Sequence, residues 1–424
     1  MQRSDCEIGI IGAGVAGLAA AARLAKAGKH VVCLEASDRI GGRIRTVHDP
    51  AAAIPIELGA EFVHGRPPEI WDVIRKASLT AYEHTADALH FASGRVVAKA
   101  PVGEIADQAL EKMSKSDRKK DESFEQYLRN SRQRPNVKKW ARIQVEGFNA
   151  ARSNVISAAS LKQDSEAQDD IDGDRIFRLL NGYDAIPQFL LHSIPDHKKI
   201  VRSNALAKTI RWKRGRVEVE YEDRTLRCQK LIVTVPLGVL QRGAIHFDPE
   251  PKDVLEGARS LALGQVYRVT FQFREAFWDE DEKFQKIGFL VSDDKQFFTW
   301  WTTHPIIAPV LTGWCGGSAA EQFRKAKPSA ISNAALASLA RILKRKVMPP
   351  QAIYFHDWHA DPFFRGAYSY APAGALGARK KLATPVDNTL FFAGEAAESK
   401  GHSGTVHGAI ASGVGAANLA LGVL

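Results

Sequence analysis

Apolar and polar positions near the amino terminus predict a strand, a helix and a second strand in quick succession. The run over 7–11 is short and apolar, as in a buried strand, and the alanine-rich stretch over 18–26 is typical of a helix. Gly28 ends this helix, and the apolar run over 30–34 predicts the second strand. This order of elements is that of a parallel βαβ unit.

In later parts of the chain, the spacing of apolar residues is typical of helices in some segments and of strands in others. Apolar spacing predicts mainly helices over 71–180, strands over 266–315 and a helix over 319–346. From residue 388 onward, a short strand precedes a long helix rich in glycine and alanine. We therefore expect an α/β protein, and 424 residues are enough for two domains.

Three glycines lie between the first strand and its helix, in the order Gly12-x-Gly14-x-x-Gly17. Gly12 suits a tight turn, Gly14 lets the backbone approach a pyrophosphate, and Gly17 lets the helix pack closely on the strand. The N–H groups at the start of the helix favour phosphate. Glu35, at the end of the second strand, is placed to accept hydrogen bonds from ribose hydroxyls. The pattern predicts a bound dinucleotide.

A second glycine pair occurs in the segment "RIGGRIRT" over 39–46. Gly41 and Gly42 let the chain pass close to a phosphate or sugar, and Arg43 can form a forked contact with the pyrophosphate. The longer string "EASDRIGGRIRT" resembles the flavin-dependent amine oxidase superfamily, which includes monoamine, polyamine and L-amino-acid oxidases and the flavin histone demethylases. That resemblance implies FAD as the cofactor.

Four further segments carry the same resemblance: "IPIELGAEFVHG", "LIVTVPLGVL", "DPFFRGAYSYAPAGA" and "TLFFAGEAAESKGHSGTVHGAIASGVGAANLAL". It implies a Rossmann-type FAD-binding domain interleaved with a substrate domain of mixed sheet plus helices. The expected FAD-binding domain comprises 1–70, 190–265 and 370–424, and the substrate domain comprises 71–189 and 266–369. The resemblance assigns these residues to FAD: Gly12, Gly14, Ala16, Gly17, Glu35, Ala36, Arg39, Gly42, Arg43, Gly59, Ala60, Glu61, Phe62, Ala207, Gly394, Glu395, Thr405, Val406 and Ala409.

The chain departs from the family pattern at two positions. Many relatives bind flavin covalently through a cysteine where this chain has Ala367, so we expect non-covalent FAD. Most relatives also carry a lysine, bonded through water to flavin N5, where this chain has Arg268. Arginine keeps the charge but not the compact donor geometry, so we expect a slow reaction with oxygen.

The resemblance also implies positions on the substrate side. Arg268, His64 and Tyr368 match catalytic positions, with Tyr368 as the first aromatic of a cage whose second position falls on Thr405. Strand alternation in "FFTWWTTHP" places Phe298 and Trp300 on one face and Phe297, Thr299 and Trp301 on the other. The sequence leaves open which face lines the pocket, and we assign Phe298 and Trp300 to it. No histidine spacing matches a metal motif, so no metal is expected.

Charge and composition limit the classes of partner that we expect for this protein. The net charge of +10 comes from scattered basic clusters without a recognised binding module, so we expect no nucleic acid. The four cysteines are far apart and form no C-x-x-C pattern, which indicates free thiols and a cytoplasmic location. The uncharged carboxy-terminal stretch is a little short for a bilayer, so no membrane partner is expected.

The expected activity is oxidation of a C–N bond of a small-molecule organic amine. Hydride passes to flavin N5, the imine hydrolyses, and O2 or another acceptor reoxidises the flavin. An L-amino-acid oxidase stays open as an alternative, with Arg268 or Arg365 binding the carboxylate, and so does a polyamine oxidase, although the basic charge would repel a polycation. A flavin-binding partner protein with little turnover is the alternative from another class.

Overall fold

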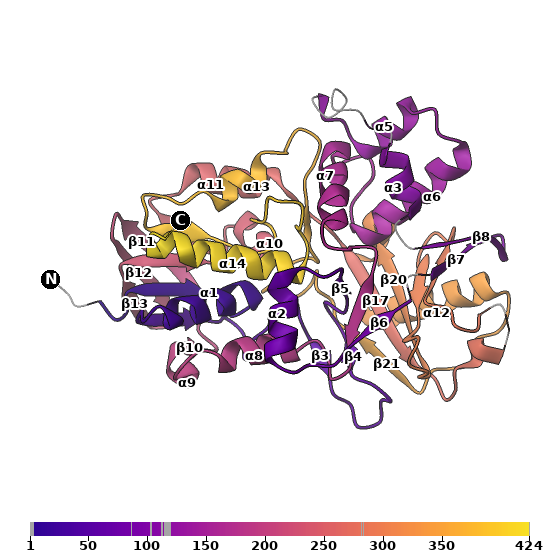
Figure 1. Ribbon diagram of the computed structural model, residues 1–424, viewed down its shortest axis with the longest axis horizontal. Coiled ribbons are helices and arrows are strands. Elements are labelled where there is room, and N and C mark those ends of the chain that lie inside the picture. The colour runs from indigo at the N-terminus through magenta and orange to yellow at the C-terminus, as the bar shows by residue number, and fades with distance from the viewer. Residues whose placement is uncertain are drawn as a thin grey trace.

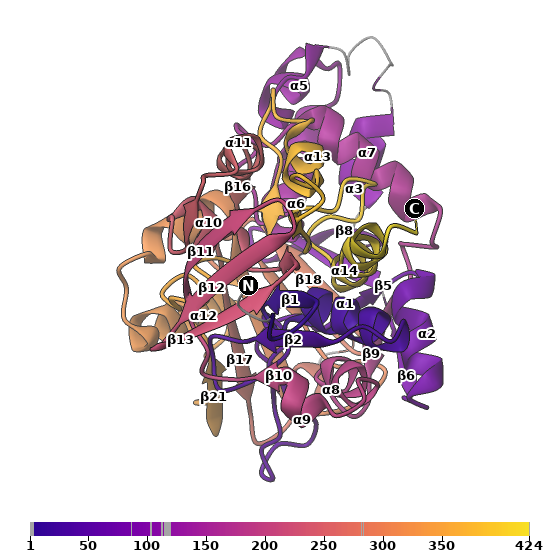
Figure 2. The same cartoon turned by 90° about the vertical axis from the view of Figure 1, so that its left-hand side faces the viewer.

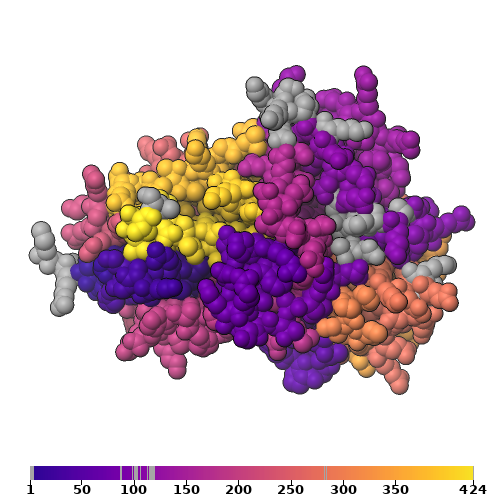
Figure 3. All heavy atoms as spheres, viewed as in Figure 1, coloured from indigo at the N-terminus to yellow at the C-terminus, as the bar shows by residue number. Residues whose placement is uncertain are grey.

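The computed structural model describes residues 4–85, 87–101, 104–111, 113, 120–280, 282 and 284–423. The chain forms two lobes, and both chain ends lie in the same one, at the left in Figure 1. The first and last helices lie side by side there, so that indigo and yellow atoms adjoin in Figure 3. Distant parts of the sequence therefore build each lobe together.

A parallel sheet of five strands forms the centre of the first lobe, in the order β10-β2-β1-β14-β23. Its strands are β1 (Ile8–Ile11), β2 (Val31–Leu34), β10 (Val201–Arg202), β14 (Lys230–Val233) and β23 (Leu390–Phe392). Helices α1 (Val15–Lys26), α2 (Pro68–Lys76), α8 (Ala185–His192) and α14 (Val406–Leu421) share one apolar core with this sheet. A four-stranded sheet covers its other face (Figure 2).

That covering sheet has the order β13-β12-β11-β15. Its strands are β11 (Ala207–Lys213), β12 (Arg216–Tyr221), β13 (Arg224–Cys228) and β15 (His246–Asp248), and α10 (Leu237–Gln241), α11 (Lys252–Ser260) and α13 (Ala378–Ala383) adjoin it. Two further sheets have two short strands each. One pairs β3 (Thr46–Val47) with β4 (Ile56–Glu57), and the other pairs β16 (Ala262–Leu263) with β22 (Ser369–Tyr370).

Glycines permit the close approach of α1 to its neighbours. A methyl group at Gly17 would lie 1.9 Å from the carbonyl oxygen of Gly12, so α1 packs directly on the turn that precedes it. A methyl group at Gly413 on α14 would lie 2.1 Å from the carbonyl oxygen of Ala16. Both contacts need glycine because a β-carbon cannot approach a backbone atom so closely.

The second lobe contains a seven-stranded sheet in the order β21-β17-β20-β19-β18-β7-β8. Its strands are β7 (Asp87–Ala92), β8 (Arg95–Pro101), β17 (Val266–Gln272), β18 (Phe289–Ser292), β19 (Thr299–Trp301), β20 (Val310–Gly316) and β21 (Ala352–Phe355). Helix α12 (Pro328–Leu343) packs on one face with Val269, Phe271 and Trp300. The other face is turned toward α6 (Pro135–Phe148), whose Trp140 packs with Phe289 and Trp301.

Further elements complete the two lobes. They are β5 (Val63–His64), β6 (Ala81–His84), β9 (Ile176–Leu179), α3 (Glu104–Glu111), α5 (Phe124–Asn130), α7 (Ala158–Asp169) and α9 (His197–Ile200). Helix α9 lies beside β10 and β2 in the first lobe, and α3 lies beside α6 and α7 in the second. The expected α/β class is confirmed, and the described residues of 71–180 are mainly helical as expected, but the expectation missed the strands β6 to β9 that also lie there. Strand β7 pairs with β18, about two hundred residues later, so local apolar spacing does not reveal it. The predicted domain boundaries stay a prediction.

Candidate active site

A cavity of about 550 Å³ lies where the two lobes meet. It is lined by residues from the glycine turns before α1 and after β2, from the start of α14 and the end of β2, and from the seven-stranded sheet and α6. A cavity of this size at a junction of lobes is typical of a cofactor or substrate site.

Two glycine turns adjoin at the start of α1. Gly14 is the N-cap residue of α1 and has no side chain to cap the helix. The first helical N–H groups are therefore free to bind an anion. Gly41 donates a hydrogen bond to the carbonyl of Ala13, and a methyl group at Gly42 would lie 3.3 Å from the Cα of Gly14. Gly12 and Gly42 have φ of +101° and +62°, which glycine adopts without strain. "RIGGRIRT" therefore forms the second half of one backbone cradle.

Glu35 lies at the β2 end of this cradle. Its Oε2 accepts a hydrogen bond from the Ala13 N–H at 2.7 Å, and its Oε1 accepts from the Ser37 N–H at 2.9 Å. The carboxylate is held in place by the first glycine turn and by the segment after β2, and Glu35 lines the cavity. This placement suits a group that receives ribose hydroxyls.

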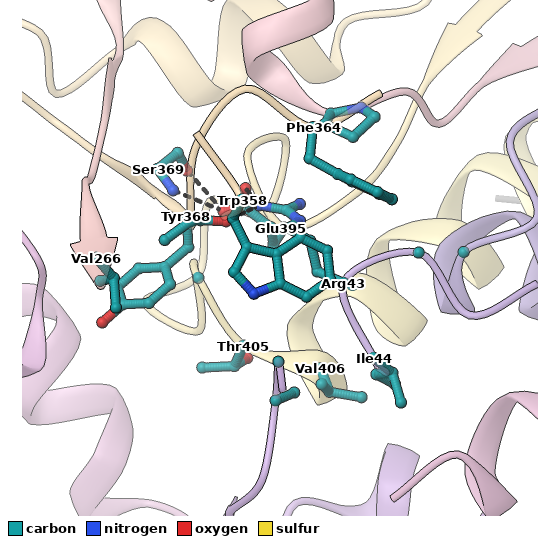
Figure 4. Close-up of a pocket in the computed structure, with 18 of the residues that line it drawn as sticks. Arg43, Ile44, Val266, Trp358, Phe364, Tyr368, Ser369, Glu395, Thr405 and Val406 are labelled. Atoms are coloured by element: carbon teal, nitrogen blue, oxygen red, sulfur yellow. Dashed lines mark hydrogen bonds and ion pairs between the residues drawn. The ribbon is translucent and has the colours of Figure 1, made fainter. Parts of the chain in front are cut away.

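Arg43 joins the cradle to the carboxy-terminal segment (Figure 4). Its Nη1 lies 2.9 Å from Oε1 of Glu395 and also donates to the carbonyl oxygen of Ala367. Ser369 donates its hydroxyl to Oε2 of Glu395 at 2.7 Å. Burial alone would raise the pKa of Glu395, but Arg43 and Arg379 outweigh it and hold that pKa below its usual value.

Two predicted cofactor residues differ in placement from the rest. Arg39 does not line the cavity, because its guanidinium donates to the carbonyl oxygens of Gly42 and Ile44 at 2.8 and 3.1 Å. These contacts hold the shape of the turn, and the cofactor role that the resemblance assigns to Arg39 stays a prediction. Gly17 lies beneath the turn, against Gly12, and not in the cavity wall.

The start of α14 closes the cradle on its far side. Thr405 caps this helix, since its Oγ1 accepts the Gly408 N–H at 3.0 Å and donates to the His402 carbonyl at 2.6 Å. Thr405 and Val406 lie on one side of the cavity in Figure 4, with Arg43 and Glu395 across from them. Helix α14 therefore directs its positive dipole end into the cavity.

These residues fit FAD. The cavity combines two glycine turns at an uncapped helix start, an acid at the end of β2 and a second helix start, which are the groups that a dinucleotide needs. The predicted FAD residues in the cavity wall are Gly12, Gly14, Ala16, Glu35, Ala36, Gly42, Arg43, Gly59, Ala60, Glu61, Phe62, Ala207, Gly394, Glu395, Thr405, Val406 and Ala409.

One face of the seven-stranded sheet forms the opposite wall. Thr299 and Trp301 of β19 line the cavity. Trp300 points the other way, where it stacks on Phe271 at 6.2 Å in the core beside α12. Phe298 packs beside Gly147 of α6 and lies outside the cavity wall. The assignment of Phe298 and Trp300 to the pocket is therefore wrong. Within β19, alternation turns Trp300 toward α12 and Thr299 and Trp301 toward the cavity, whereas Phe297, before the strand begins, also packs in the α12 core.

Arg268 belongs to a buried ion-pair network in that wall. Its Nη2 lies 2.7 Å from Oε2 of Glu61, and its Nη1 donates to the Gly59 carbonyl at 3.0 Å. Oε1 of Glu61 lies 2.6 Å from Nη2 of Arg178, and the indole N–H of Trp301 donates to Oε2. Burial lowers the pKa of Arg268, and Glu61 opposes that shift. The guanidinium is thus already paired, although it reaches the cavity wall.

His64 and Tyr368 both lie in the cavity wall, as expected. The ring of His64 contacts Phe148 edge-on with centroids 5.4 Å apart, and burial lowers the pKa of His64 to about 4. A neutral imidazole therefore faces the cavity near pH 7. The hydroxyl of Tyr368 donates to the carbonyl oxygen of Phe148, which fixes its ring beside Gly404.

A match to a known protein family covers almost the whole chain. Residues 15–421 match the family described as flavin containing amine oxidoreductase. The chain belongs to this family. It is therefore an FAD-dependent enzyme that oxidises amines, and FAD, when bound, accepts a hydride from the carbon beside the amine nitrogen.

Individual relatives of this flavin amine oxidase agree with the family. It is 29% identical over 450 residues to "Polyamine oxidase 2" of Arabidopsis thaliana, covering 98% of this chain and 88% of the relative. It is similar in fold to cyclohexylamine oxidase from Brevibacterium oxydans, with a TM-score of 0.84, 22% identity and 99% of each chain covered. A putrescine oxidase bound to putrescine gives a TM-score of 0.82 at 22% identity, over 97% of this chain and 98% of the other.

The sequence did not indicate several cavity residues of this flavin amine oxidase. They are His90, Trp140, Gln144, Asp164, Trp314 and Trp358. Most lie on α6, α7, β7 and β20, outside the segments that carry the family resemblance. A preference for aromatic residues on these elements was the only signal, and it does not separate a cavity wall from an apolar core.

Two absences concern the described part of this flavin amine oxidase. Its histidine, cysteine and acidic side chains form no group of three that could hold a metal ion among the residues that the structure describes. None of the helices in the described ranges has both the length and the apolar character that a membrane crossing needs.

Proposed function

We propose that this flavin amine oxidase acts on amines with one nitrogen and an apolar body, and that it holds FAD non-covalently. The observation that carries the proposal is the aromatic cavity wall of Phe62, Trp140, Phe289, Trp301 and Trp314. Such a wall favours the neutral form of an amine, because it offers an ammonium group no water. The neutral form is the one that can give up a hydride.

Amino-acid substrates are less favoured, because Nη2 and Nη1 of Arg268 already have partners in Glu61 and Gly59, and Nε is its one unpaired nitrogen among the described residues. A substrate carboxylate would have to displace the buried Glu61 from this guanidinium, which leaves one carboxylate without a counter-charge. Arg365 also lines the cavity and remains the other candidate for that role.

Polyamine oxidation is the second candidate. The relatives include polyamine oxidases of plants, and Asp164 of α7 places a carboxyl group in the cavity wall. Burial raises the pKa of Asp164 to about 7, with Glu398 adding to the shift and Arg379 opposing it. A carboxyl group that is only partly ionised near pH 7 attracts a second ammonium weakly, so the amine with one nitrogen remains favoured.

An anaerobic amine panel tests the proposal. Flavin absorbance is followed after addition of alkylamines, arylalkylamines, spermine, spermidine and L-amino acids. The highest ratio of limiting reduction rate to dissociation constant is expected with the amines of one nitrogen. Fastest reduction by spermine would establish the polyamine alternative, and no reduction by any amine would favour the flavin-binding protein with little turnover.

Acid precipitation tests the flavin linkage in the same preparation. Ala367 has no thiol, and the four cysteines are free and buried. FAD should therefore pass into the supernatant, and flavin retained in the pellet would contradict the proposal. The free cysteines also support a cytoplasmic location, and O2 or another acceptor is proposed to reoxidise the flavin.

A further inference from the structure

A single row of side chains crosses five strands of the seven-stranded sheet. In register, Arg268 pairs with Trp314, Trp314 with Thr299, Thr299 with Val291, and Val291 with His90. All five line the cavity. Four strand spacings separate the first residue from the last, which is about 19 Å along the wall. The row begins at the paired guanidinium of Arg268 and ends at an imidazole.

Among the residues that the structure describes, that imidazole has no hydrogen-bond partner. His90 is 4% exposed, and neither of its ring nitrogens is paired within the described part of the chain. The indole of Trp140, on α6, meets it edge-on with ring centroids 5.0 Å apart. Trp140 is 3% exposed, and its N–H likewise has no partner among the described residues. Buried polar groups of proteins are nearly always paired, so two adjacent unpaired ones need an explanation.

Other tryptophan and histidine side chains nearby form hydrogen bonds to backbone carbonyls of the protein. Trp314, in the same row, donates its N–H to the Gly147 carbonyl at 2.8 Å. His84, also buried, has backbone carbonyls near both ring nitrogens, at 2.8 Å from Thr85 and 3.0 Å from Thr302, so the nitrogen that carries the proton always has an acceptor. Other buried atoms without a partner among the described residues include Nε of Arg268 and Nε2 of His407, but His90 is the residue whose two ring nitrogens are both unpaired there, and the unpaired N–H of Trp140 adjoins it.

We propose that His90 and Trp140 form a polar subsite that binds a neutral oxygen atom at the end of the substrate remote from its amine. The inference rests on the proposed function, because it assumes an amine in this cavity. The ligand class is an amine with an apolar body that ends in a hydroxyl, ether or carbonyl group.

The chemistry of the two side chains selects this class. A neutral imidazole offers one donor and one acceptor, and an indole offers one donor, so a hydroxyl can accept from Trp140 and donate to His90. Burial lowers the pKa of His90, which keeps it uncharged and gives a carboxylate no counter-charge. The row contains no acidic side chain that would favour a second ammonium.

Pairs of amines test the subsite. The probes are straight-chain primary amines of six to twelve carbons, each with and without a terminal hydroxyl. Anaerobic titration of flavin absorbance gives a dissociation constant for each probe, and rapid mixing gives its limiting reduction rate. At the best chain length, the hydroxylated amine should bind about tenfold more tightly than its parent. Equal affinities at every length would overturn the subsite.

Variants locate the effect. His90→Phe keeps the ring contact with Trp140 and removes both nitrogens, so it should abolish the hydroxyl preference, and Trp140→Phe should reduce it. His90→Asn keeps one donor and one acceptor and should retain part of the preference. Trp314→Phe is the matched control, because its N–H is already used by Gly147, and it should leave the affinity ratio unchanged.

The outcomes separate this inference from the proposed function. If both members of each pair reduce the flavin without a preference, or if the preference survives in His90→Phe, the subsite is refuted and the proposed function stands. If neither member reduces the flavin, both ideas fail together. Circular dichroism and flavin content identify a variant that has not folded, and His90→Asn then decides the outcome.

Discussion

Arg43 connects the amino-terminal and carboxy-terminal parts of the candidate FAD site through Glu395 and Ala367. Arg43→Ala removes a charge-assisted contact and leaves the buried Glu395 with less compensation, so flavin affinity should fall about tenfold or more. The ratio of flavin to protein absorbance during dilution measures this. Arg75→Ala, on the exposed side of α2, serves as the control and should bind flavin as the wild type does. Unchanged affinity in Arg43→Ala would count against its cofactor role.

Arg268 is the residue at which the expected slow reaction with oxygen is best examined. Its guanidinium is held by Glu61 and Gly59, so it cannot take up the compact single-donor geometry of a lysine. Arg268→Lys keeps the charge beside Glu61 and frees space in the wall. We expect it to speed the reaction with oxygen more than the reduction by substrate.

Stopped-flow measurement of the two half-reactions checks this expectation for Arg268→Lys. Trp301→Phe is a useful comparison, because it removes another hydrogen bond to Glu61 without changing the charge. If the wild type already reacts rapidly with oxygen and Arg268→Lys slows it, the arginine replaces the lysine effectively or lies away from flavin N5.

At the scale of elements, the crossing of α1 and α14 brings the two helix starts to the same cavity. Gly413→Ala would place a methyl group 2.1 Å from the carbonyl oxygen of Ala16 and force the helices apart. The free energy of unfolding should fall by about 1 to 3 kcal/mol, and flavin affinity should fall with it. Urea denaturation followed by circular dichroism and flavin fluorescence measures both.

The same helix provides the control for that substitution. Gly415 also lies on α14, but a methyl group there would meet nothing within 4 Å. Gly415→Ala should therefore leave stability unchanged or raise it by up to about 1 kcal/mol, because alanine favours the helix. Equal losses in both variants would show that helix packing is not the cause.

The stability of the whole molecule should depend on pH through Glu57. Burial raises the pKa of this residue to about 7, while Thr46 and the N–H of Tyr183 oppose the shift. A carboxyl group whose folded-state pKa is raised contributes stability at low pH and loses it as pH rises through 7. Between pH 6 and 8, the wild type should therefore lose about 1 kcal/mol relative to Glu57→Gln, which has no group to titrate.

Thermal unfolding at constant ionic strength measures the effect of Glu57→Gln. The exposed Glu275→Gln is the control and should follow the pH dependence of the wild type. Parallel curves for the wild type and Glu57→Gln would show that Glu57 does not titrate in this range.

Sequence alone determined the α/β class and most of the candidate FAD site. The reason is that its signals are local: Gly12 and Gly42 adopt the positive φ of turns, Gly14 stands at the N-cap of α1, and Glu35 and Thr405 stand directly at the end of a strand and the start of a helix. A pattern of this kind can be interpreted without knowing what packs against it. Arg39 and Gly17 are the exceptions, because both lie outside the cavity wall: the guanidinium of Arg39 donates to the carbonyls of its own turn, and Gly17 packs against Gly12.

Tertiary structure decided the substrate wall. Alternation along β19 divides Trp300 from Trp301, but which of them faces the cavity depends on α12 and α6, which come from distant parts of the chain. The row that ends at His90 exists only because β7 pairs with β18, and the partner of Arg268 is set by the approach of Glu61. Long-range contacts of this kind leave no periodic trace in the sequence, so the wall and its unpaired polar end become visible only in the folded molecule.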